Sequence, residues 1–145
     1  MTADGSEAPV PPGDDDPLPR ILSDTAALAA LDDAPGGALW RLAEPGRQLD
    51  ANVVRIPPGR RVDTHREPEL DVLLLVLDGS GTLTAPDGTH VLTRGTLTWL
   101  PHGSTRALAA DDAGLTYLTV HRRRPGMRIQ RPGPDAPGPA GATKS

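Results

Sequence analysis

The stretch DTHREPELDVLLLVLDGSG, residues 63–81, joins a cluster of polar side chains to a long apolar run. His65, Glu67, Glu69 and Asp71 precede the run VLLLVL, and the turn-forming sequence DGSG follows it. The run does not alternate between apolar and polar residues, and its short length is typical of a strand buried on both faces. The stretch therefore predicts a buried β-strand that directly follows a group of metal-ligating or acid–base side chains.

Turn-forming sequences recur at regular intervals after residue 37. PPGRR, PDGT, PHGS and DDAG separate short runs rich in Leu, Val and Thr, and turns about eight to eleven residues apart are typical of an all-β sandwich or barrel. We expect strands over residues 38–43, 48–56, 70–77, 81–85, 89–93, 96–100, 105–109 and 115–121, the last two forming a hairpin around ADDAG. One short helix is expected over about 24–31, with Ser23 as its N-cap.

Length and composition favour a single domain over residues 21–124. Residues 1–20 and 125–145 are rich in Pro, Gly and Asp and poor in apolar groups, so we expect both tails to be disordered. No apolar stretch approaches the roughly 18 residues that span a bilayer, and the N-terminus does not resemble a signal peptide, so we expect a soluble cytoplasmic protein. The basic C-terminal tail lacks aromatic residues and the rest of the chain is acidic, which argues against nucleic acid or a membrane as partner.

The glycine, proline and polar spacing resembles the cupin family, small β-barrels in which two motifs meet and hold a metal ion. The first family motif is G, five residues, H-x-H, three or four residues, E, six residues, G. Here Gly59, His65, Glu67, Asp71 and Gly79 occupy that frame, with a carboxylate in place of the second His, Asp in place of Glu, and one extra residue before the last Gly. The preceding PPG is also typical of the family.

The second family motif is G, five residues, P-x-G, two residues, H, three residues, N. Gly95, Pro101 and Gly103 match it, whereas Arg106 stands where the last metal-binding His belongs and Ala110 where the Asn belongs. The resemblance covers roughly residues 50–121. It implies an all-β cupin-like double-stranded β-helix, which is a jelly-roll barrel.

A cupin metal usually has three His ligands and one Glu, and this chain keeps only His65 of that set. A guanidinium cannot donate a lone pair, and at about 5 Å it would repel a divalent ion by several kcal/mol. We therefore expect no cofactor and no stoichiometric metal. The alternative is Mn, Fe, Ni or Zn held by His65, Glu67 and Asp71. The absence of cysteine excludes disulfides, thiolate nucleophiles and zinc sites built on sulfur.

Instead of a metal site, the two motif frames predict a small-molecule site inside the barrel. The expected ligand-binding residues are His65, Glu67, Asp71 and Arg106, with Trp99 and Tyr117 as further lining residues. Trp99 has an alternative interpretation as a core residue. If residues 105–109 and 115–121 form a hairpin, His121 lies roughly 10–13 Å from the site at about 3.3 Å per residue. His90 and His102 are interpreted as loop residues.

Four functions remain open at this point. The first is a binding module in which Arg106 holds an anionic or carbonyl group and His65 helps to orient it. The second is a metal-free enzyme resembling cupin sugar epimerases, with His65 as general base and Arg106 stabilising an enolate. The third is a metal-dependent dioxygenase or isomerase, and the fourth is a scaffold whose role is to form a homodimer.

Overall fold

A computed structural model of the chain describes residues 16–31 and 35–124. Disorder was expected of residues 1–20 and 125–145, which lie outside the described part except for residues 16–20, and these five are exposed and outside any helix or strand. The described chain contains one short helix and seven strands. In chain order they are α1 (Thr25–Ala29), β1 (Gly37–Arg41), β2 (Leu49–Ile56), β3 (Arg61–Arg66), β4 (Val72–Ala85), β5 (Gly88–Thr93), β6 (Leu97–Leu100) and β7 (Thr105–Arg122).

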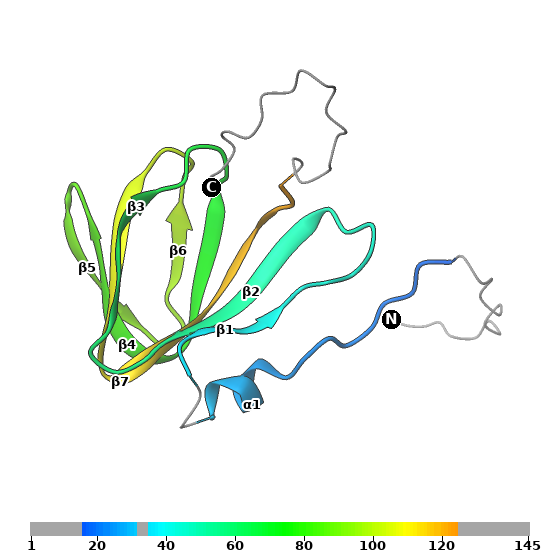
Figure 1. Cartoon of the computed structure of the whole chain (residues 1–145), viewed down its shortest axis with the longest axis horizontal. Coiled ribbons are helices and arrows are strands. Elements are labelled where there is room, and N and C mark those ends of the chain that lie inside the picture. The colour runs from blue at the N-terminus through cyan, green and yellow to red at the C-terminus, as the bar shows by residue number, and fades with distance from the viewer. Residues whose placement is uncertain (1–15, 32–34, 125–145) are drawn as a thin grey trace, which may run out of the picture.

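The two long strands β4 and β7 organise the whole fold. They pair with each other in antiparallel fashion, β2 and β3 pair with β7, and β5 and β6 pair with β4. Because β4 and β7 bend, the sheet folds over on itself into a barrel, with β3 and β5 at one end and β1 and β2 at the other (Figure 1). This is the all-β jelly-roll arrangement that the turn spacing and the cupin resemblance predict.

Strand β4 contains the apolar run and supplies much of the core. Val72, Leu74 and Val76 are buried, whereas Leu73 between them is 43 % exposed on the outer face of the sheet. The prediction that this run is buried on both faces is therefore wrong. Only one face of the strand is buried. Because the exposed face also carries apolar residues, the sequence does not alternate between apolar and polar residues.

Strand β7 differs from the predicted hairpin. The segments 105–109 and 115–121 do not fold back on each other, because both lie along β4 within one continuous strand. The register shifts between the pairs Gly79–Leu115 and Gly81–Ala110, so residues 111–114 bulge out of the ladder. Gly79 adopts a positive φ of 81° at this point, and an added Cβ would collide with the carbonyl oxygen of Gly114.

Strand β3 was not predicted from the sequence. It pairs with β7 alone, and five of its six residues are exposed, so it has no apolar face that could reveal it. Its end is fastened to the turn between β6 and β7. The Arg66 Nε donates to the Gly103 carbonyl at 3.1 Å, and the Gly103 amide donates to the Glu67 carbonyl at 2.7 Å. These bonds hold the end of the first cupin-like motif, at Arg66 and Glu67, next to Gly103 of the second.

The helix α1 is shorter than predicted and begins one residue later. Asp24 is its N-cap rather than Ser23, because the Asp24 carboxylate accepts hydrogen bonds from the amides of Ala26 and Ala27. The helix lies outside the barrel and contacts β4. Within residues 16–31 and 35–124, no helix is long and apolar enough to cross a membrane.

Candidate functional site

A cavity of about 360 Å³ lies at the mouth of the barrel, and we call it the mouth cavity. Its floor is apolar and is formed by core residues of β4, β6 and β7. Its polar side chains come from β3, from the segment that follows β3, and from both ends of β7. They are His65, Glu67, Arg106, Tyr117, Thr119, His121 and Arg124.

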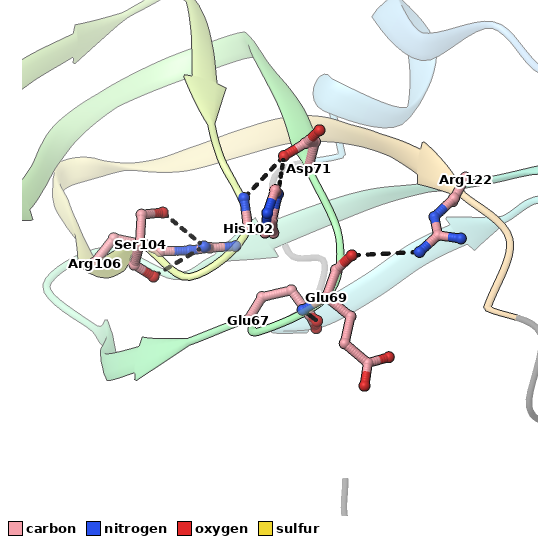
Figure 2. Close-up of polar contacts among 7 residues, drawn as sticks. All are labelled: Glu67, Glu69, Asp71, His102, Ser104, Arg106 and Arg122. Atoms are coloured by element: carbon pink, nitrogen blue, oxygen red, sulfur yellow. Dashed lines mark hydrogen bonds and ion pairs between the residues drawn. The ribbon is translucent and has the colours of Figure 1, made fainter.

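Among the described residues, Arg106 is the one charged residue that is buried, with 5 % of its surface exposed. It pairs with His65 in the register between β3 and β7, which puts both side chains on the same face. Its Nη1 donates to the carbonyl and the hydroxyl of Ser104, at 3.3 and 3.1 Å (Figure 2). Burial lowers the pKa of Arg106, and the Glu67 carboxylate opposes that effect. Within the described chain, its Nε and Nη2 have no hydrogen-bond acceptor.

Glu67 pairs with Arg124, one of the two arginines that line the cavity. Arg124 donates to its Oε1 at 2.6 Å, and the Glu69 amide donates to its Oε2 at 2.9 Å. Burial alone would raise the pKa of Glu67, but these hydrogen bonds and the charge of Arg124 outweigh it and lower the pKa below its usual value. Glu67 is therefore ionised at neutral pH, and its carboxylate is already engaged.

His65 does not pair with a carboxylate in the described structure. Its Nδ1 lies 3.2 Å from the carbonyl oxygen of Asp63, and the ring is exposed at the cavity. The hypothesis that Glu67 or Asp71 polarises this imidazole is not supported by their contacts, because both carboxylates bind other groups.

Asp71 lies outside the mouth cavity, which corrects its predicted place in the site. Its Oδ1 accepts hydrogen bonds from the His102 amide at 2.9 Å and pairs with the His102 Nδ1 at 2.8 Å (Figure 2). The backbone and ring hydrogen bonds from His102 lower the pKa of Asp71. The sequence holds a signal for this position, since Leu70 and Val72 are both buried and strand alternation turns the residue between them outward.

His121 lines the mouth cavity together with Arg106, although the hairpin from which its separation was predicted does not form. Because β7 is continuous and curves around the barrel, its first and last residues both face the mouth, including Arg106 and His121. The His121 Nδ1 lies 2.7 Å from the carbonyl oxygen of Arg122. His102 does lie in a turn as predicted, and its ring pairs with Asp71, a contact that nothing in the sequence indicated.

The two aromatic candidates have different surroundings. Tyr117 is buried and lines the mouth cavity, and burial raises its pKa to about 12. Trp99 is 58 % exposed and lines a different cavity, between β5 and β6, so the alternative that it is a core residue is wrong. Arg106 lines both cavities.

The donors do not fit the metal site that the cupin resemblance implies. His65 and Glu67 line the mouth cavity, Asp71 is bound to His102 outside it, and Arg106 occupies the position of the last ligand. In the described part of the chain, no group of three or more His, Asp or Glu side chains could hold a metal ion.

The comparisons with known proteins agree with this architecture. Residues 55–124 match the family model described as the AraC-like ligand binding domain. A structure titled sugar phosphate isomerase from a cupin superfamily, from Silicibacter pomeroyi, is 27 % identical with a TM-score of 0.50, over 55 % of this chain and 53 % of that one. The chain thus spans about half the length of that relative. No curated protein matches the sequence.

Two further solved structures share the fold. One comes from Bacillus halodurans, with a TM-score of 0.59 and 19 % identity over 75 % of this chain and 86 % of that one. The other is KdgF from Halomonas sp., with a TM-score of 0.53 and 17 % identity over 60 % and 78 %. The fold is a β-barrel of the double-stranded β-helix class with a cavity at its mouth. The family match and the similarity to the cupin-superfamily structure support membership of the cupin family.

Proposed function

We propose that this chain binds a small molecule in the mouth cavity through an anionic or carbonyl group that accepts hydrogen bonds from Arg106. The single observation that carries the proposal is that the Arg106 guanidinium lines the cavity with N–H groups still available to a ligand. It is 5 % exposed, it lines the cavity, and its Nε and Nη2 have no acceptor among the described residues. Because the guanidinium lines the cavity, a ligand there can accept charge-assisted hydrogen bonds from these N–H groups.

The charge of the cavity favours the same ligand. Arg106 and Arg124 are permanently charged, and Glu67 is the one carboxylate that lines the cavity. Because Glu67 already pairs with Arg124, it leaves Arg106 without a direct ionic partner in the described structure. Tyr117 and Thr119 add hydroxyl groups that suit a polar ligand, and the raised pKa keeps Tyr117 protonated at neutral pH.

A metal-free site follows from the same side chains. The guanidinium supplies a fixed positive charge at the position where other cupins place a ligand, and it repels a second cation there. We therefore propose that the protein holds no stoichiometric transition metal. The dioxygenase alternative needs Asp71 as a ligand, and the contacts of Asp71 with His102 weigh against it.

An isomerase or epimerase remains the second candidate. It is favoured by the similarity to the structure titled sugar phosphate isomerase and by the placement of His65 on the same face as Arg106. In that reaction His65 would remove a proton next to a carbonyl, while Arg106 stabilised the enolate oxygen. Exchange of ligand protons with deuterated solvent, lost in His65→Ala, would distinguish this activity from binding alone.

The binding proposal is tested by thermal shift and calorimetry with inorganic phosphate, acetate and a panel of sugar phosphates. At least one of these anions should bind, and Arg106→Gln should weaken binding about 10- to 150-fold, because a hydrogen bond to a charged group contributes about 1.5–3 kcal/mol. Arg94→Gln is the matched control, since Arg94 is exposed and lies outside both cavities. Equal binding by the wild-type protein and Arg106→Gln would contradict the proposal.

We also propose that the chain forms a homodimer through the outer face of the sheet. Leu49 on β2 and Leu73 on β4 are large exposed apolar residues on the face that flanks β7. Leu73→Asp should shift the protein from dimer to monomer in sedimentation equilibrium, whereas Leu31→Asp, outside the sheet, should not. A monomeric wild-type protein would refute this proposal.

A further inference from the structure

A second cavity, of about 570 Å³, lies between β5 and β6, and we call it the side cavity. Both strands pair with β4, but they do not pair with each other, so the barrel stays open along this edge. The strands β5 and β6 stand apart, since β6 pairs with the start of β4 and β5 with its end (Figure 1). The volume is within the range of about 300–1,000 Å³ that small-molecule pockets occupy.

The side cavity and the mouth cavity meet at Arg106. Two residues line both of them, Leu100 and Arg106, so the guanidinium stands at the partition between the two spaces. Ser104, which accepts from the Arg106 Nη1, also lines the side cavity. A group bound to Arg106 can therefore be approached from either side.

The side cavity is apolar around this cation. Leu83 and Leu92 form buried parts of its wall, and Val91, Leu97 and Trp99 stand at its opening with exposures of 71, 64 and 58 %. Exposed apolar side chains gathered around one opening indicate a binding surface rather than scattered surface residues.

Asp87 and His90 are the other ionisable residues that line the side cavity. Asp87 and His90 form a pair, with the His90 Nε2 3.1 Å from the Asp87 Oδ1, and both are exposed. The wall offers apolar contacts and one cation, Arg106, whose described hydrogen bonds are with Ser104 and not with a carboxylate.

We propose that the side cavity takes the apolar portion of an amphipathic anion, whose carboxylate or phosphate binds Arg106 while its alkyl chain or ring lies between β5 and β6. This inference rests on the proposed anion binding at Arg106 and adds the class of ligand. The fit is complementary at both ends, because the cation lies at the partition and the apolar residues extend from there to the rim.

The test measures the affinity of the full chain for straight-chain carboxylates from acetate to octanoate, and for the corresponding alkyl phosphates, by calorimetry. Affinity should rise about fourfold for each added CH₂ that enters the cavity. Ala85→Phe fills the side cavity from the end of β4 and should reduce the ratio of octanoate to acetate affinity to near one. Ala38→Phe, on the exposed strand β1, is the matched control and should keep the wild-type ratio.

A second variant covers the case in which Ala85→Phe does not fold. Val91→Asp places a carboxylate at the exposed rim, where it should weaken octanoate binding at least tenfold. If short anions bind through Arg106 but chain length has no effect, the side-cavity inference is wrong and the proposed function stands. If no anion of either series binds, both are wrong. Octanoate binding that persists in Arg106→Gln would also overturn the inference, because the anion would have no role.

Discussion

Replacing Glu67 by glutamine should weaken the fold and strengthen ligand binding at the same time. The substitution removes the charge from the 2.6 Å pair with Arg124 and keeps an oxygen that can accept from the Glu69 amide. A charge-assisted hydrogen bond contributes about 1.5–3 kcal/mol. Because the Arg124 side chain is 49 % exposed, solvent screening reduces the expected loss to about 1–2 kcal/mol. For a barrel of this size the midpoint of thermal unfolding should fall by about 4–10 °C.

The same change should favour anionic ligands. Glu67 is the one acidic side chain lining the mouth cavity and partly offsets the charge of Arg106. With a neutral side chain there, an anion meets less repulsion and a less compensated guanidinium. A gain of about 1.4 kcal/mol corresponds to tenfold tighter binding. A residue with a purely structural role would not move stability and affinity in opposite directions.

The assay combines thermal unfolding with calorimetric titration of phosphate or octanoate. Glu69→Gln is the matched control, because Glu69 is exposed in the same segment, and its effect on stability should stay within about 0.5 kcal/mol. The reasoning is refuted if Glu67→Gln unfolds at the wild-type temperature, or if it binds anions more weakly than the wild-type protein.

Three further outcomes follow from the same structure. The folded state lowers the pKa of Glu67. Its contribution to stability should therefore be complete above about pH 4.3 and disappear as the pH falls through the lowered pKa. In acid unfolding curves, the difference in stability between the wild-type protein and Glu67→Gln should then vanish. Elemental analysis should find no stoichiometric transition metal after dialysis, whereas Arg106→His, with His121 in the same cavity, should gain measurable zinc or nickel affinity. Denaturant unfolding should show that Gly79→Ala costs about 2–5 kcal/mol, from its positive φ and a backbone collision, and clearly more than Gly95→Ala, which has open space.

The features that the sequence predicted correctly have strong local causes. The run from Val72 to Leu77 is apolar enough to require burial of at least one face. Gly95 and Gly103 both adopt positive φ, which few other residues tolerate, so their spacing marks turns independently of the rest of the chain. These two signals suffice for the all-β fold and for the alignment of the motif frames.

The features that the sequence did not predict depend on pairing between distant segments. Strand β3 is an edge strand with mostly exposed residues, so what stabilises it is its hydrogen bonding to β7 and not an apolar face. The bulge at 111–114 keeps β7 continuous where the turn-forming residues suggested a hairpin, and this continuity places His121 at the mouth. Strand alternation that starts at His65 predicts that Asp71 faces the site, but Pro68 interrupts that alternation. The buried neighbours of Asp71, Leu70 and Val72, instead determine the direction of its side chain.

The position of Arg106 limits the chemistry that this barrel can support. A metal ion in a cupin polarises its ligand through coordination bonds, which require lone pairs from the protein. A guanidinium supplies one positive charge and only N–H donors, so it can hold an anion or a carbonyl oxygen by hydrogen bonds but cannot coordinate water or dioxygen as a metal ion does. Because Arg106 has no carboxylate partner among the described residues, a ligand that accepts from its remaining N–H groups gains a charge-assisted hydrogen bond. The proposed function therefore requires Arg106 to line the cavity without an ionic partner, and the described contacts of its side chain are with Ser104 alone.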